Sequence, residues 1–121
     1  MGDLDPIVFP GGGGRRRRLK PPGRPVTFDR RELDRILDLY GRKVAAGEWR
    51  DYAIAFLRDR AVFSVFRRAT EFPLYRIEKD LSLARRQGAY AVVAASGRVL
   101  KRGPDLERVL RVIDPALRLV N

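Results

Sequence analysis

The sequence of 121 residues contains no cysteine and no histidine, and it has one methionine and one tryptophan. Without cysteine the chain has no disulfide, no thiolate nucleophile and no zinc site of the usual kind. Without histidine it lacks the commonest general base and the one side chain that titrates near neutral pH when unperturbed. We therefore expect neither a metal nor a cofactor.

The remaining residue types give little support for catalysis. Nearly every Asp or Glu has an Arg or Lys beside it, as in Arg58-Asp59-Arg60, which favours ordinary surface pairing. The serines have no histidine to activate them, and no Ser-x-x-Lys motif occurs. We predict that the protein is not an enzyme.

Long apolar runs are also missing. No stretch of 18 apolar residues occurs, so no segment is predicted to span a membrane. The short run from Ile7 to Phe9 ends at Pro10 and is much too short for the core of a signal peptide. We therefore expect a cytoplasmic protein.

What the sequence does contain is positive charge. There are 26 Lys and Arg residues against 15 Asp and Glu, which gives a net charge of +11 and an isoelectric point near 11.1. Hydrophobic residues make up 45% of the chain, enough to build one core. A field of this sign attracts polyanions, which include nucleic acid, an anionic membrane surface and an acidic protein face.

The charge is divided between two regions. Residues 1–25 hold five prolines, the tract Gly11–Gly14 and the run Arg15–Arg18, with no periodic apolar pattern. This composition predicts a flexible, disordered basic arm, in which six bases against two acids give +4. The remaining +7 belongs to residues 26–121, which we expect to form a single domain.

A helix is predicted directly after the arm. Asp29 and Glu32 have the spacing of a capping box, and apolar residues at helical spacing follow as far as Val44. Gly47 is suited to end the helix in a left-handed conformation. Gly41 inside the helix indicates either close packing or a bend.

The rest of the chain predicts five short strands and a second helix. The strands are expected at 51–57, 61–67, 72–79, 89–95 and 98–102, with a hairpin at Arg58–Arg60 and a turn at Ser96-Gly97. The segment from Asp80 to Gly88 resembles a connecting turn of helix, and Gly103-Pro104-Asp105 opens the last helix. The fold class is therefore α+β: an N-terminal helix, an antiparallel meander of about five strands and a C-terminal helix, with both helices on one face.

Basic residues and aromatic rings alternate along the predicted strands. Basic side chains around exposed aromatic rings are typical of sheets that bind single-stranded nucleic acid, whereas a solvated outer face with core aromatics gives the same pattern. The candidate residues for binding nucleic acid or an acidic partner are Arg15, Arg16, Arg17, Arg18, Lys20, Arg67, Arg68, Tyr75, Arg76, Lys79, Arg85, Arg86, Lys101 and Arg102.

Several of these segments resemble a known family. The resemblance lies in Val26–Leu33, Ala61–Arg68, Pro73–Lys79, Arg86–Tyr90 and Leu100–Gly103, and it covers nearly all of Val26 to Asp114. The family is a bacterial one found mainly among alphaproteobacteria, known as domain of unknown function 2794. The resemblance implies a bacterial cytoplasmic setting and brings no activity, ligand or site residue with it.

Two functions remain open at this point. The first is a non-catalytic nucleic-acid-binding module, for RNA or DNA, in which arm and fold act together. The second is an accessory subunit or assembly factor that docks its fold on a larger protein complex and lays the arm across an acidic surface. A continuous basic stripe on the fold would favour the first, and a wide apolar patch beside the sheet would favour the second.

Overall fold

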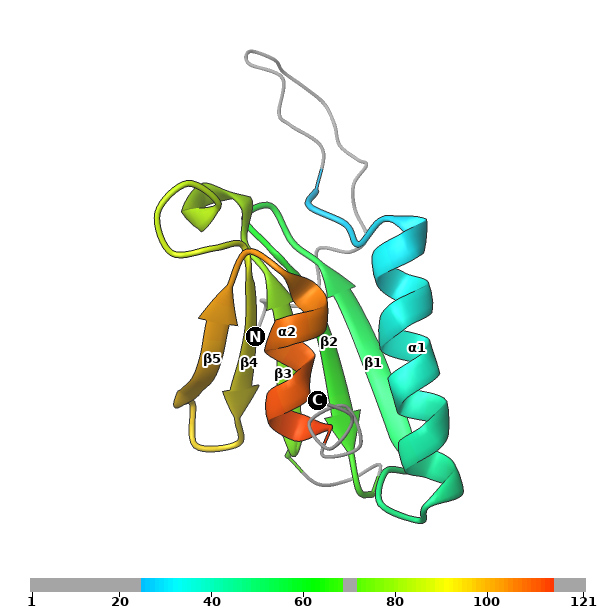
Figure 1. Ribbon diagram of the computed structural model, residues 1–121. Helices are drawn as coiled ribbons and strands as arrows, with labels where there is room; N and C mark the ends of the chain where they lie inside the picture. The colour runs from blue at the N-terminus through cyan, green and yellow to red at the C-terminus, as the bar shows by residue number, and fades with distance from the viewer. Residues whose placement is uncertain (1–24, 69–71, 115–121) are drawn as a thin grey trace.

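The computed structural model describes residues 25–68 and 72–114. One long helix is followed by five antiparallel strands, which pair in chain order, and by a second, short helix (Figure 1). The elements are α1 (Arg30–Ala45), β1 (Asp51–Phe56), β2 (Ala61–Phe66), β3 (Tyr75–Lys79), β4 (Tyr90–Ala94), β5 (Val99–Gly103) and α2 (Leu106–Leu110). The predicted α+β class and the meander are confirmed.

Local signals in the sequence define both ends of α1. The Asp29 carboxylate accepts a bond from the Glu32 backbone N–H at 2.8 Å, and the Glu32 carboxylate accepts one from the Asp29 N–H at 2.7 Å. This is the predicted capping box, which satisfies two backbone donors that the helix leaves free. Gly47 follows the helix with φ of 79°, a conformation that disfavours other residues.

Two expectations for the central elements need correction. The third strand begins at Tyr75 rather than at Phe72, because Pro73 has no N–H to donate to the ladder. Gly41 does not mark close packing, since a Cβ placed there would have no atom within 4 Å among the atoms compared.

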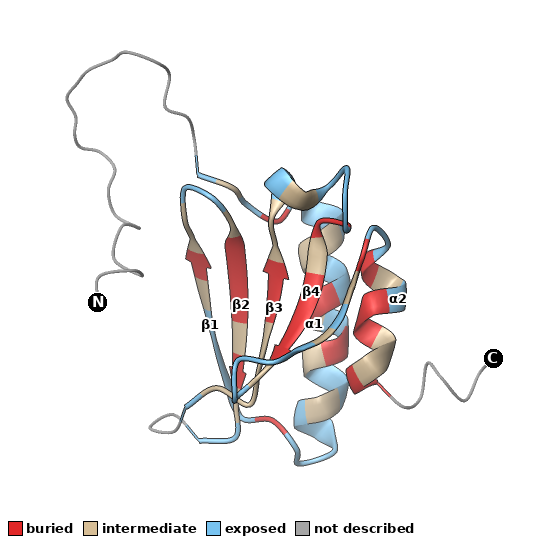
Figure 2. Ribbon diagram, turned by 90° about the vertical axis from the view of Figure 1, so that its left-hand side faces the viewer, coloured by how far each residue is buried: buried red, intermediate tan, exposed pale blue. Residues whose placement is uncertain are grey.

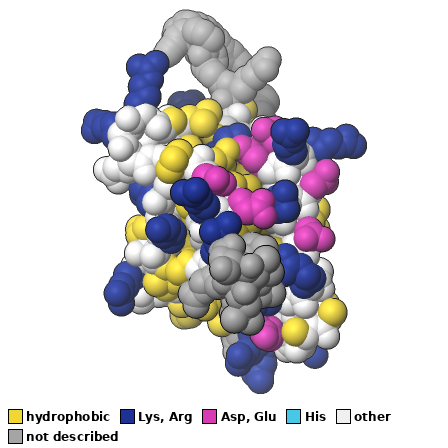
Figure 3. Space-filling view, in the orientation of Figure 1, with side chains coloured by type: hydrophobic (Ala, Val, Ile, Leu, Met, Phe, Trp, Pro, Cys, Tyr) yellow, Lys and Arg dark blue, Asp and Glu magenta, His cyan; other side chains and the backbone are white. Residues whose placement is uncertain are grey.

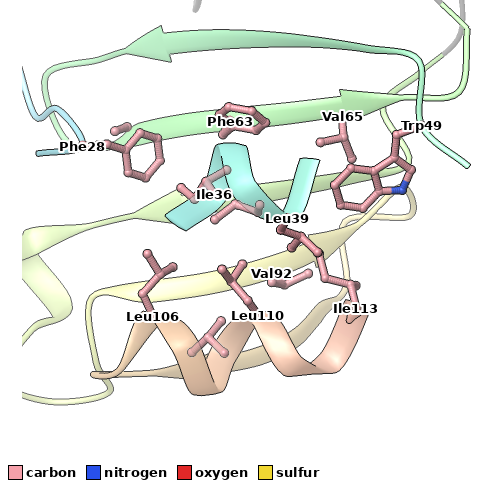
Figure 4. Packing of buried hydrophobic residues seen from close by; sticks show 13 residues of the cluster. Phe28, Ile36, Leu39, Trp49, Phe63, Val65, Val92, Leu106, Leu110 and Ile113 are labelled. Atoms are coloured by element: carbon pink, nitrogen blue, oxygen red, sulfur yellow. The ribbon is translucent and has the colours of Figure 1, made fainter. Parts of the chain in front are cut away.

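Both helices lie on the same face of the sheet (Figure 2). The core forms between the sheet and the two helices, where residues of β2, β3 and β4 pack against α1 and α2 (Figure 4). Ile36 and Leu39 are the buried residues of α1, and the side chains of Phe63, Ile77 and Val92 are fully buried below the helices. Trp49 is 4% exposed, and its ring lies near Tyr40 of α1 and Tyr75 of β3.

Both helices are short compared with a membrane-spanning helix. Helix α1 has 16 residues and a solvated face, and α2 has five. Within residues 25–68 and 72–114, no helix is long and apolar enough to cross a membrane.

A close contact between two glycines joins the β3–β4 connection to the end of β5. Gly88 has φ of 101°, and a Cβ on it would lie 2.2 Å from the carbonyl carbon of Gly103. No other residue fits there without a shift of the backbone. The contact holds the connection, residues 81–88, beside the edge strand of the sheet.

Candidate nucleic-acid interface

The charge of the folded region is concentrated in the sheet and its connections. We define the sheet layer as residues 50–68 and 72–104, and the helix layer as residues 29–48 and 105–114. The sheet layer has 12 bases against four acids, a charge of +8, whereas the helix layer has seven bases against eight acids, a charge of −1. The positive field therefore comes almost entirely from one layer of the molecule.

The charges of the helix layer neutralise one another. Arg35 pairs with Glu107 at 3.2 Å, and Lys43 pairs with Glu48 at 3.2 Å. Arg42 donates a hydrogen bond of 3.0 Å to the carboxylate of Asp114. Asp114 is buried and follows the turn of helix, residues 111–113, that comes directly after α2. Pairing of this kind leaves little positive field over the helices.

The sheet layer instead exposes unpaired bases along β5. We call Arg85, Arg86, Arg98, Lys101 and Arg102 the basic edge. The first two lie on the connection that the Gly88 contact holds against β5, and the last three lie on β5 or the turn before it. Four are exposed and Arg102 is half-buried, and none forms an ion pair within the described part of the chain.

The surface view agrees with this distribution. Figure 3 shows Lys and Arg side chains without acidic neighbours along the side of the molecule where β5 lies, and Lys and Arg side chains mixed with acidic ones over the helices. Guanidinium and ammonium groups can each bind a phosphate, because phosphate oxygens accept hydrogen bonds from both. The predicted residues Arg85, Arg86, Lys101 and Arg102 thus lie together.

Arg67 and Arg68 form a separate group. They follow β2 at the end of the sheet opposite to the connection with Arg85 and Arg86. Arg50 lies beside them, since its backbone N–H donates to the Phe66 carbonyl at 2.8 Å. Phe72, in the same connection, is 86% exposed.

Three other predicted residues have partners inside the fold. The ring of Tyr75 packs near Trp49, with centroids 6.4 Å apart. Arg76 Nε lies 3.1 Å from a carboxylate oxygen of Glu78, and Lys79 Nζ lies 2.8 Å from Glu32. These contacts tie the sheet to itself and to α1, so we do not include the three residues in the basic edge.

Glu32 is the centre of the contact between the two layers. Besides its capping bond, its carboxylate accepts from Lys79 Nζ at 2.8 Å and from the Tyr90 hydroxyl through a short hydrogen bond. Burial raises the pKa of Tyr90 well above its usual value, and the bond to Glu32 raises it further. Tyr90 therefore acts as a structural donor.

Two surface residues were missed by sequence reasoning. Arg98 extends the basic edge, and its position in the predicted strand 98–102, which already contains two bases, was a usable signal. Phe72 was assigned to a strand, and only the exposure caused by the late start of β3 distinguishes it. The predicted residues Arg15, Arg16, Arg17, Arg18 and Lys20 lie outside the described residues.

The described residues show no arrangement for metal chemistry. Across 25–68 and 72–114, no group of three His, Cys, Asp or Glu side chains is placed to hold a metal ion.

Comparison with known protein families identifies a match that covers most of the chain. Residues 26–110 match the family described as Protein of unknown function (DUF2794). Neither the curated proteins nor the solved structures gave a match to the chain. The matched range includes every residue of the basic edge.

Proposed function

We propose that this chain, which belongs to the family of proteins of unknown function DUF2794, is a non-catalytic module that binds nucleic acid through its basic edge. The observation that carries the proposal is the segregation of charge, +8 on the sheet layer and −1 on the helix layer. A stable fold does not require this segregation, since acidic and basic residues distributed evenly over both layers could pair with one another. A one-sided excess of positive charge is instead typical of a surface that binds a polyanion.

The geometry supports binding through phosphates. Tyr75 and Tyr90 have partners within the fold, and the described residues place no aromatic side chain on the basic edge. Stacking on bases therefore contributes little at this edge. Phosphate contacts carry no direct sequence information, so we expect RNA and DNA to bind with weak sequence preference.

The arm adds bases to the same function. Arg15–Arg18 and Lys20 precede the fold in the sequence and supply further phosphate contacts in this proposal. We place the function in the cytoplasm, where nucleic acid is available to a chain of this charge.

The test compares two variants of the full chain that lose the same charge from different layers. In the edge variant Arg85, Arg86, Lys101 and Arg102 are changed to Ser, and in the matched control Arg30, Arg31, Arg35 and Arg108 are changed to Ser. Labelled single- and double-stranded oligonucleotides are titrated with each protein. We expect the edge variant to bind at least about tenfold more weakly and the control to stay close to the parent protein.

Two results would overturn the proposal. One is equal weakening in both variants, which would show that only net charge matters. The other is the absence of binding by the parent protein tighter than the generic non-specific range of about 10⁻⁴ to 10⁻⁶ M.

The second candidate is an accessory subunit that docks on an acidic surface of a larger protein complex. Phe72 favours it, because this side chain is 86% exposed in the connection that also holds Arg67 and Arg68. Aromatic residues and arginine are enriched in protein interfaces. Phe72→Ala should then prevent co-purification of the partner protein while leaving oligonucleotide binding unchanged. If Phe72→Ala instead weakens oligonucleotide binding and leaves co-purification unchanged, this candidate is excluded.

A further inference from the structure

The face of the sheet opposite the helices carries small apolar residues on β2 and β4, on either side of the charged residues Arg76 and Glu78 of β3. Neighbouring residues on a strand point to opposite faces, so the residues next to Phe63, Ile77 and Val92 point away from the helices. Among the described residues, no helix or strand lies over this face (Figure 2). We call it the open face, and its residues are Asp51, Ala53, Ala55, Arg60, Val62, Ser64, Phe66, Arg76, Glu78, Ala91, Val93 and Arg102.

The centre of the open face is withdrawn from solvent all the same. Val62, Ala91 and Val93 are 7%, 0% and 3% exposed, and Glu78 is 8% exposed. Antiparallel sheets with one solvated face usually alternate between apolar and polar residues. Small apolar residues at the centre indicate instead a surface that is covered.

The charges on this face define what can cover it. Arg60 and Arg76 flank the carboxylate of Glu78, with Arg76 Nε at 3.1 Å and Arg60 NH1 at 4.0 Å from it, and Arg102 lies two strands further along the face. The Nε atom of Arg60 is buried and has no hydrogen-bond acceptor within the described residues. A buried donor without an acceptor is costly, so an occupant should bring a carboxylate together with apolar side chains.

The start of the chain has this chemistry. Residues 1–14 contain no base, although the chain as a whole is strongly basic. Within them, the segment Asp3-Leu4-Asp5-Pro6-Ile7-Val8-Phe9 combines two carboxylates with four large apolar side chains. Its charge of −2 is opposite in sign to that of the open face, where three arginines stand against Glu78 and Asp51.

We propose that residues 3–9 of the chain bind the open face of its own sheet. The chain enters the fold at the β1–β2 hairpin, where the Val26 N–H donates to the Leu57 carbonyl at 2.9 Å. The 15 intervening residues, 10–24, can span up to roughly 50 Å, whereas the five strands span roughly 19 Å. The segment can therefore reach any part of the face, and Arg15–Arg18 are then held close to the sheet layer. This inference does not depend on the proposed function.

The absence of cysteine from the chain makes a direct distance measurement possible. A nitroxide is attached to the full chain at Ala53→Cys, an exposed position on the open face, and in the matched control at Arg108→Cys on the outer side of α2. We expect the nitroxide at position 53 to broaden the amide resonances of residues 4–9 strongly, and the nitroxide at position 108 to leave them sharp. Adding Ile7→Asp and Phe9→Asp to the Ala53→Cys chain should abolish the broadening, because neither change touches the described fold.

Two results would overturn the inference. Equal broadening from both positions, or none from either, would show that the segment does not bind this face. A mixture of two proteins, one with the nitroxide and the other with only the isotope label, tests whether residues 3–9 bind the open face of a second copy of the chain. Broadening of comparable size in that mixture would assign the face to a contact between two molecules.

Discussion

The two layers of this molecule use charge in opposite ways. In the helix layer, Arg35 and Arg42 each have a carboxylate partner on another part of the layer, and the sum is −1. In the sheet layer the sum is +8, and the five bases of the basic edge have no ion-pair partner within the described residues. Charge in the helix layer is paired within the fold, whereas the charge of the sheet layer is the feature that our proposal assigns to binding a partner.

The difference separates stability from function. Substitutions that change contacts between the layers should affect unfolding, and substitutions on the basic edge should affect binding alone, because exposed unpaired charges contribute little to folding. The following predictions test this separation. Trp49, the single buried tryptophan, provides the fluorescence signal for unfolding.

The largest loss of stability is expected at Gly88. In Gly88→Ala the new methyl group would collide with the backbone of Gly103, and the positive φ adds strain. We expect the free energy of unfolding to fall by about 3 kcal/mol. Denaturant unfolding measures it, and a change below that of a typical surface substitution would mean that residues 81–88 are not held against β5.

The next largest effect is expected at Glu32, which joins the two layers. Glu32→Ala removes one side of the capping box and leaves Lys79 Nζ and the Tyr90 hydroxyl without their carboxylate. We expect a loss of about 2 kcal/mol in denaturant unfolding. Arg31→Ala, an exposed neighbour, is the control, and equal effects of the two changes would contradict the role assigned to Glu32.

Asp29→Ala should have a smaller effect. It removes the N-terminal cap of α1 but leaves the contacts of Glu32 with β3 and β4 in place. The expected loss is about 1 kcal/mol. An effect as large as that of Glu32→Ala would show that the cap, and not the contact between layers, dominates at this site.

Gly41→Ala should stabilise the protein slightly. The position is exposed within α1, and a methyl group there meets no atom within 4 Å among those compared. We expect a gain between about 0.4 and 1 kcal/mol, because alanine loses less backbone freedom in a helix than glycine. A lower midpoint of thermal unfolding for Gly41→Ala than for the parent protein would indicate that α1 bends at this glycine.

The pH dependence of stability reports on Tyr90. Its pKa is raised in the folded state above the ordinary value of 10.0, so the protonated hydroxyl stabilises the fold. This contribution is fully present below pH 10 and is lost as the pH rises above that value. Tyr90→Phe should therefore show a shallower fall of the unfolding free energy in this range, and identical curves for the two proteins would contradict the shift.

Local signals account for the parts of the fold that were predicted. The capping box at Asp29 and Glu32 and the alternation along the strands depend on neighbours in sequence, and both were confirmed. The face that each strand presents to the helices was not predictable, because β4 is apolar on both sides and three of its five residues are buried. The order of the strands in the sheet does not determine which face of β4 points to the helices, because this also depends on where both helices lie.

Contacts distant in sequence decide which basic residues form ion pairs inside the fold. Lys79 pairs with a residue 47 positions away and Arg42 with one 72 positions away, and no local pattern predicts either pair. The same applies to the contact of Gly88 with Gly103, which joins Arg85 and Arg86 to Lys101 and Arg102. The composition predicted a basic surface, and these contacts determine which basic residues belong to it and which have partners inside the fold.

The most direct test of the charge segregation is the salt dependence of oligonucleotide binding. Each phosphate that the protein neutralises releases counterion, so the slope of log affinity against log salt counts the bases in contact. Replacing Arg85, Arg86, Lys101 and Arg102 with Ser should lower this slope by about four, and the matched change of Arg30, Arg31, Arg35 and Arg108 should lower it by at most about one. Equal slopes for the two variants would contradict the account.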